Sequence, residues 1–191
     1  SYAGRAKEFG FQSGGFDFRF EDLMERVQAV IKKIEPHDSV ERYTELGVDV
    51  IQGEAKIVSP YEITVGGKTL TTRNIVVATG ARPFVPPIKG LDQIDYLTSD
   101  NVWELRDRPE KLVVLGGGPI GCELTQVFAR VGCRVTQVEM MPRIMGREDP
   151  EIAQAVQQKF KNEGIQVLTG HKAKEVVVQD DGTKILICEH D

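Results

Sequence analysis

Three glycines at the spacing Gly-x-Gly-x-x-Gly carry the clearest chemistry in the sequence, within VVLGGGPIGCELTQVFARVGCRVTQVE, residues 113–139. Gly116 permits a tight turn, Gly118 lets a pyrophosphate approach the backbone, and Gly121 lets a helix pack closely on a sheet. The free N–H groups and positive end of a helix beginning near Pro119 would bind phosphates without a basic side chain. We therefore expect a dinucleotide site comprising Gly116, Gly117, Gly118, Pro119, Ile120 and Gly121.

An acidic residue closes the second apolar run after this turn. Glu139 follows Gly116 at close to the ~20 positions expected of the acid that bonds the adenosine ribose of a dinucleotide. A carboxylate at this place repels the 2′-phosphate of NADP(H), so the sequence favours NAD(H), although the nearby Arg143 leaves NADP(H) open as the alternative. A parallel sheet without a ligand would need three glycines and an acid to coincide by chance.

Cysteines and histidines do not predict a second site. The cysteines match neither a Cys-x-x-Cys pair nor a zinc pattern, and the histidines have no partners at the spacing of a catalytic triad. We expect isolated, reduced thiols in packed positions, surface histidines and no metal. The residues concerned are Cys122, Cys133, Cys188, His37, His171 and His190.

The composition is that of an ordinary globular protein of 191 residues, 40% of them hydrophobic, with a formal net charge of -5. No cluster of Lys and Arg could follow a nucleic-acid backbone, and no apolar run approaches the ~20 residues that cross a bilayer. The opening SYAGRAKEFGF lacks the pattern of a signal peptide. We expect a cytoplasmic protein that binds neither nucleic acid nor a membrane.

The residues before the glycine turn predict a helical part and then an antiparallel part. Apolar residues at helical spacing predict a helix over 19–36, and a shorter helix follows that Asp38 or Ser39 caps and Gly47 ends. Short β-rich runs separated by turns then predict an antiparallel meander and, after it, an apolar strand. These runs cover residues 48–58, 61–65, 68–72 and 74–80.

The residues around the glycine turn predict alternating strands and helices. The proline-rich stretch ARPFVPPIKGL, residues 81–91, predicts a stiff extended connector and a domain boundary. Ser99 is expected to cap a short helix through Trp103 and Leu105. The alternation implies a parallel sheet with right-handed crossovers, followed by a hairpin about Asp181 and Gly182. The expected elements are strands 111–115, 134–139 and 165–168, helices 119–131 and 150–164, and the hairpin 172–190.

These motifs together resemble the flavin-dependent pyridine nucleotide-disulfide oxidoreductases, in particular the mercuric reductase and dihydrolipoamide dehydrogenase branch. The resemblance rests on GGGPIGCELTQVFARVGCRVTQVE, NIVVATGARPFVPPIKGL, TSDNVWEL and REDPEI, and it covers nearly the whole chain. It implies an α/β fold with two parts. Residues 106–191 would form a Rossmann-like NAD domain with a parallel sheet, incomplete at its carboxyl end, and residues 1–105 the helical and antiparallel-meander remainder of an FAD domain.

The resemblance also implies roles for individual residues. Ala55 would touch the adenine end of FAD through its backbone, and Thr79 and Gly80 would lie where the chain passes close to the flavin nucleotide. Glu123 matches the glutamate that pairs with a flavin-side lysine near the nicotinamide. An exposed helix carboxylate without that role is the alternative for Glu123.

Several parts of the family pattern are missing from this sequence. The family begins with its own FAD-binding glycine turn and a Cys-x4-Cys pair, and it ends with a dimerisation domain that carries a His/Glu pair. We therefore expect the central segment of an enzyme that passes hydride from NADH through FAD to a disulfide, dithiol or metal-ion substrate. We expect the parent to be a homodimer through the absent domain, and the segment alone to be inactive.

Two other functions are weighed against this interpretation. A free-standing dinucleotide-binding or sensing module without catalysis is the alternative. A simple NAD-dependent alcohol dehydrogenase is disfavoured, because all the tyrosines precede the glycine turn.

Overall fold

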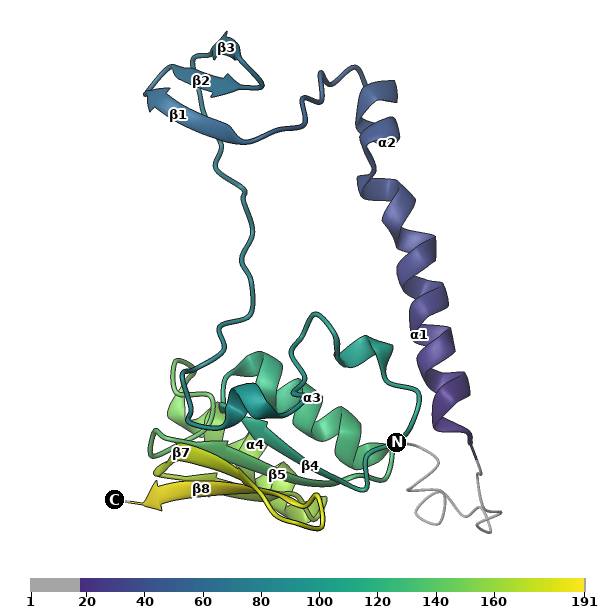
Figure 1. Ribbon diagram of the computed structural model, residues 1–191, viewed down its shortest axis with the longest axis vertical. Helices are drawn as coiled ribbons and strands as arrows, with labels where there is room; N and C mark the ends of the chain where they lie inside the picture. Colours follow the sequence, from purple (N-terminus) through teal and green to yellow (C-terminus); the bar gives the residue numbers. More distant parts are fainter. Residues whose placement is uncertain (1–17, 191) are drawn as a thin grey trace. The chain divides into compact units, whose positions relative to one another are not determined.

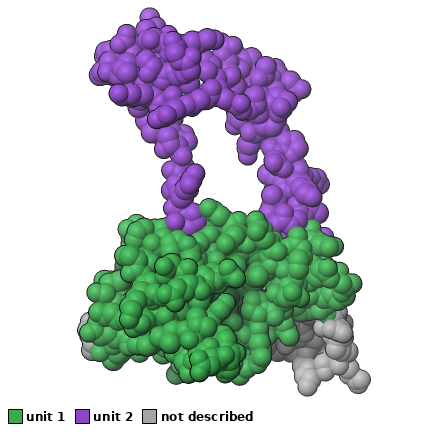
Figure 2. All heavy atoms as spheres, in the orientation of Figure 1, with its two compact units in different colours: residues 1–25, 84–191 green, residues 26–83 purple. Residues whose placement is uncertain are grey.

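The computed structural model describes residues 18–190, which belong to two compact units. One unit comprises residues 1–25 and 84–191, and the other comprises residues 26–83 (Figure 2). The chain passes between them twice, after residue 25 and after residue 83, and the second boundary falls within the proline-rich connector. The sequence predicts another division, after residue 105, between an FAD-binding part and an NAD-binding part. That division stays a prediction. The opening stretch considered for a signal peptide lies outside the described residues.

A three-stranded parallel sheet with two helices forms the centre of the first unit (Figure 1). The strands pair in the order β4-β5-β6, with Leu112 opposite Val135 and Val138 opposite Leu168. The elements are β4 (Lys111–Leu115), α3 (Pro119–Arg130), β5 (Arg134–Glu139), α4 (Pro150–Asn162) and β6 (Gln166–Thr169). Each lies close to its predicted range, and the alternation of strand and helix confirms the expected parallel α/β arrangement.

A hairpin follows the parallel sheet, and the connector is anchored on it. Its strands are β7 (His171–Val178) and β8 (Lys184–His190), antiparallel as predicted. Val176 N donates to Lys89 O at 2.8 Å, and Lys89 Nζ lies 2.7 Å from the Glu175 carboxylate. A Cβ at Gly90 would lie 2.2 Å from Val176 O, and Gly90 has φ +78°. The close approach of connector and strand therefore requires glycine.

Two apolar clusters form the core of the first unit. The first turns of α1 (Phe20–Ile34) contribute to one cluster, and Trp103 packs against it while its Nε1 donates to Ser99 O at 2.8 Å. Trp103 is therefore a packing residue of this cluster. The buried members are Phe20, Met24, Val102, Phe128, Cys133 and Val135 in one cluster and Cys122, Ile144, Phe160 and Ile165 in the other.

A carboxylate joins the carboxyl-terminal ends of α3 and α4. The Nε and Nη2 atoms of Arg130 donate to Glu163 at 3.1 and 2.7 Å. Gln126 Nε2 also donates to it at 3.1 Å, and Lys159 Nζ lies at 3.3 Å. The hydrogen bonds from Arg130, above all, lower the pKa of Glu163 to about 2. The pair therefore holds the two crossover helices together through a charge that persists at neutral pH.

The second unit contains helices and an antiparallel meander. Ser39 Oγ accepts from Arg42 N at 3.2 Å, which confirms Ser39 as the cap of the second helix, and Gly47 follows its end with φ 83°. The meander pairs in the order β1-β2-β3, as predicted, but its first strand begins only at Ala55. The elements after α1 are η2 (Glu35–Asp38), α2 (Val40–Glu45), β1 (Ala55–Ser59), β2 (Glu62–Val65) and β3 (Lys68–Thr71).

One predicted strand and one predicted helix cap are wrong. Residues 74–80 form no strand, and the side chains of Val76 and Val77 are 87% and 66% exposed. A run of β-branched residues becomes a strand only where another strand accepts its hydrogen bonds, and none within residues 18–190 pairs with this one. Ser99 caps no helix: a short 3-10 turn, η4 (Val102–Glu104), begins after Asn101 instead, and another, η3 (Leu91–Gln93), precedes it.

The cysteines are free thiols, as expected. Cys122 and Cys133 are buried and Cys188 is half-buried, and burial raises the pKa of each thiol. His171 is half-buried, so the expectation of a surface histidine is wrong at that position. Within residues 18–190, no helix has the length and apolar character needed to span a membrane.

Candidate dinucleotide site

The glycine turn between β4 and α3 is held by hydrogen bonds from the strand and loop beside it. Gly116 N donates to Val138 O at 2.8 Å, and Gly116 O accepts from Gln137 Nε2 at 3.0 Å. Gly117 N donates to Glu139 Oε2 at 2.5 Å, and Gly117 O accepts from Met145 N at 2.6 Å. The backbone groups of the first two glycines are thus used within the protein, and they fix the turn in place.

The Gln137 side chain supports this turn through a hydrogen bond, a role that the sequence did not predict. Its side chain is fully buried on β5, within hydrogen-bond distance of Gly116 O and of Cys122 Sγ, at 3.0 and 3.5 Å. Burial raises the pKa of the Cys122 thiol, which keeps it neutral and able to donate weakly to Gly117 O at 3.5 Å. The sequence does offer one indication of this role: Gln137 is a polar residue within an otherwise apolar part of the strand, between Val135 and Val138.

The four glycines of the turn, residues 116–118 and 121, have different surroundings. A Cβ at Gly121 would lie 2.4 Å from Gly116 O, so this glycine allows the helix to approach the turn. A Cβ at Gly117 would lie 2.8 Å from the Ile144 side chain. A Cβ at Gly118 would meet no heavy atom within 4 Å, and Gly118 has the ordinary φ of -73°. A Cβ at Gly116 would also meet no heavy atom within 4 Å, but Gly116 has φ +104°, which favours glycine. Gly118 therefore has both open space around it and an ordinary backbone conformation.

The amino end of α3 offers unpaired donors to this open space. The helix begins with Pro119, and its first hydrogen bond runs from Cys122 N to Gly118 O at 2.9 Å. The N–H groups of Ile120 and Gly121 precede that bond, so they have no acceptor within the helix. Together with the positive end of the helix dipole, they fit a phosphate group.

Glu139 lies where the sequence predicts, at the carboxyl end of β5, and the backbone fixes its carboxylate. Oε2 accepts from Gly117 N at 2.5 Å, and Oε1 accepts from Met141 N at 2.7 Å. Each oxygen of a carboxylate can accept a second hydrogen bond. Glu139 is half-buried, so it can brace the glycine turn and still accept from the hydroxyls of a ribose.

Arg143, the residue that left NADP(H) open, is engaged elsewhere. Its Nη2 donates to Gly146 O at 2.8 Å, within the loop that follows β5. Its Nη1 is buried and has no hydrogen-bond partner among the described residues.

The other site residues that the sequence predicts are exposed. Glu123 is exposed on α3, one turn beyond Pro119. Ala55, Thr79 and Gly80 belong to the second unit, residues 26–83, and all three are exposed. Ala55 opens β1, whereas Thr79 and Gly80 end the irregular stretch 74–80. Within the first unit, the geometry therefore brings together the glycine turn, the amino end of α3 and Glu139.

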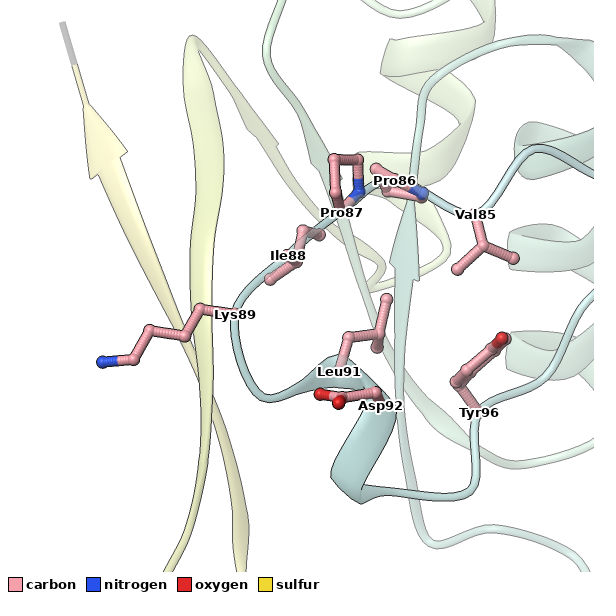
Figure 3. A pocket seen from close by; sticks show the side chains of 8 residues that line it. All are labelled: Val85, Pro86, Pro87, Ile88, Lys89, Leu91, Asp92 and Tyr96. Carbon is pink, nitrogen blue, oxygen red and sulfur yellow. The ribbon is translucent and has the colours of Figure 1, made fainter.

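Open depressions of the first unit lie elsewhere. One, of about 460 Å³, is lined by residues of the connector and the turn after it, residues 85–96 (Figure 3). The side chain of Lys89 extends away from Leu91 toward Glu175 on β7. Another, of about 640 Å³, lies over residues 94–107. Neither has a glycine of the turn or Glu139 in its lining.

Known proteins are similar to this chain over almost its whole length. The family profile described as pyridine nucleotide-disulphide oxidoreductase matches residues 5–190. The mercuric reductase of Staphylococcus aureus is 33% identical over 165 residues, which are 86% of this chain and 30% of that protein. The dihydrolipoyl dehydrogenase of Acholeplasma laidlawii is 33% identical over 177 residues, 90% of this chain and 52% of that protein.

A solved structure has the same fold. The Cu(II) complex of the HOCl-induced flavoprotein disulfide reductase RclA from Escherichia coli matches with a TM-score of 0.74 at 24% identity. The match covers 91% of this chain and 40% of that one. The likeness confirms the mixed α/β architecture, and this chain spans only 30% to 52% of the length of the two relatives above.

Proposed function

This chain belongs to the pyridine nucleotide-disulphide oxidoreductase family, and we propose that it is the NAD(H)-binding segment of a flavin-dependent oxidoreductase. In such an enzyme, hydride passes from NADH through FAD to a disulfide, dithiol or metal-ion substrate. One observation supports the proposal above the others. Side chains of the protein form hydrogen bonds with Gly116 O and Gly117 N, whereas the space beside Gly118, at the amino end of α3, is open.

The chain's own residues would act by binding and orienting the dinucleotide. The N–H groups of Ile120 and Gly121 would donate to the pyrophosphate, and Glu139 would accept from the adenosine ribose. Because Glu139 is held by Gly117 and Met141, ribose and pyrophosphate are recognised by one connected set of hydrogen bonds. The nicotinamide supplies the hydride when the cofactor is bound.

The preference for NADH over NADPH rests on charge and on the position of Arg143. A 2′-phosphate placed beside the Glu139 carboxylate would be repelled. The Arg143 guanidinium, which could offset this repulsion, bonds to Gly146 O at 2.8 Å instead. We expect calorimetric titration to give tighter binding of NADH than of NADPH. Equal or tighter binding of NADPH would contradict the assignment.

Further parts of the proposal rest on the family resemblance. Glu123 would pair with a lysine near the flavin, and its exposure on α3 is compatible with a partner from outside this chain. Ala55, Thr79 and Gly80 would lie near FAD. A cytoplasmic location and a homodimer formed through a further domain are predictions of the same kind.

A further inference from the structure

Two imidazole rings face each other at the end of the β7–β8 hairpin, and the proposed function uses neither. His171, the first residue of β7, pairs directly with His190, the last residue of β8. Their ring centroids lie 4.3 Å apart, and the ring planes are inclined at 53°. His171 is half-buried and His190 is exposed, so solvent and ions have access to the pair.

A hydrogen bond selects the tautomer of His171. Its Nδ1 lies 2.7 Å from Thr169 O. A carbonyl oxygen can only accept, so the neutral ring carries its proton on Nδ1 and leaves a lone pair on Nε2. Metal-binding histidines are oriented in the same way, with the other ring nitrogen donating to a carbonyl or carboxylate.

The spacing of the rings matches that of two ligands on one ion. With metal–nitrogen bonds of about 2.0–2.1 Å, two imidazoles on one ion have ring centroids roughly 4.5 Å apart at a right angle and roughly 5.2 Å apart at the tetrahedral angle of Zn²⁺. The observed separation is 4.3 Å. The rings would therefore separate by no more than about 1 Å to bind Zn²⁺. A Cβ at Gly170 would lie 3.8 Å from His190 Nε2, so this nitrogen lies beside the backbone that leads into His171. Glycine at this position leaves that side free of a side chain.

The charges around the rings do not oppose a cation. Directly paired residues of an antiparallel hairpin share a face, and neighbouring pairs alternate. The next pair on the histidine face is Ala173 with Cys188, and neither carries a charge. Lys172 and Glu189 form the intervening pair, on the opposite face.

We propose that His171 and His190 bind a divalent transition-metal ion through their ring nitrogens. Imidazole ligands suit Zn²⁺, Ni²⁺ and Cu²⁺, whereas Mg²⁺ and Ca²⁺ require oxygen ligands. Within residues 18–190, no group of three or more His, Cys, Asp or Glu side chains converges on a metal position. Water would complete the coordination shell, so the ion exchanges and its binding does not support the fold.

The test is a titration of the purified full chain with Zn²⁺, observed through the NMR signals of the histidine rings. The signals of His171 and His190 are expected to shift together while those of His37 stay unchanged, and Mg²⁺ should produce no change. His190→Gln is expected to weaken Zn²⁺ binding at least about tenfold, since half of the protein ligands are lost. His171→Asn should do the same, because asparagine can still donate to Thr169 O but has no second ring nitrogen.

Two matched variants serve as controls. His37→Gln removes an exposed histidine of η2, and Cys188→Ser removes the thiol on the same face of the hairpin. Both are expected to bind Zn²⁺ as the unchanged chain does, and circular dichroism of every variant reports whether the fold is intact. Unchanged Zn²⁺ affinity in a folded His190→Gln or His171→Asn variant would overturn the proposal. An equal loss in Cys188→Ser would also overturn it.

Discussion

The substitution Gly118→Val separates the ligand-binding role of the glycine turn from its structural role. Gly118 has φ -73° and ψ 177°, which any residue adopts, and no heavy atom lies within 4 Å of a Cβ placed there. The free energy of unfolding should therefore change by no more than about 0.5 kcal/mol, the range of ordinary surface substitutions. The new side chain would occupy the space in front of α3, where the pyrophosphate is proposed to bind.

The loss of dinucleotide affinity follows from the donors that the valine would block. The N–H groups of Ile120 and Gly121 would donate to a charged phosphate in the proposed complex, and hydrogen bonds to charged groups contribute about 1.5–3 kcal/mol each. Losing both costs about 3 kcal/mol or more, which is over 100-fold in Kd. Calorimetric titration with NADH measures the affinity, and urea denaturation measures the stability of the same preparation.

Gly121→Ala is the matched comparison, because the glycine there is required for packing. Its Cβ would lie 2.4 Å from the Gly116 carbonyl oxygen, so the helix must move. We expect a loss of about 1–3 kcal/mol in the free energy of unfolding, typical of an overpacked site. The reasoning is refuted if Gly118→Val binds NADH within threefold of the unchanged chain. It is equally refuted if Gly118→Val loses as much stability as Gly121→Ala.

Three further predictions test separate contacts. Glu139→Ala should weaken NADH binding by about 1–3 kcal/mol in calorimetry through loss of a charged acceptor, whereas the exposed Glu148→Ala should leave affinity unchanged. Glu163→Gln should lower the free energy of unfolding by about 1 kcal/mol, modest because Arg130 is 42% exposed. Because folding lowers the pKa of Glu163 from 4.5 to about 2, this stabilisation is present above pH 4.5 and is lost as the pH falls toward 2, which acid denaturation of both forms would show. Gly90→Ala should destabilise by about 2–4 kcal/mol in urea denaturation, since a Cβ would strike Val176 O from a left-handed backbone; an unchanged midpoint would contradict the contact between connector and hairpin.

Local patterns in the sequence were sufficient for most elements of the first unit. The apolar run before Gly116 and the run ending at Glu139 became adjacent parallel strands, with a helix between them that starts at Pro119. These elements follow from short-range properties: hydrophobic periodicity, the missing N–H of proline and the freedom of glycine to turn. Because β4 and β5 are joined through one crossover helix, their pairing also follows from connectivity.

The failures occurred where a local pattern depends on a distant partner. Residues 74–80 have the composition of a buried strand, yet strand formation also needs a neighbouring backbone, which no local pattern specifies. The start of η4 likewise depends on how the preceding residues fold, and the residue at its N-cap position is Asn101 rather than Ser99.

The types and spacing of Gly116, Gly118, Gly121 and Glu139 determined by themselves that a dinucleotide motif stands between a strand and a helix. The tertiary structure alone decided how that motif is held. Buried Gln137 reaches Gly116 O, and the Glu139 carboxylate accepts from Gly117 N and from Met141 N. It also brought together His171 and His190, the two ends of the hairpin. Periodicity along a chain encodes which face a side chain takes, whereas hydrogen bonds between strands depend on register and twist, which are set only when the whole sheet packs.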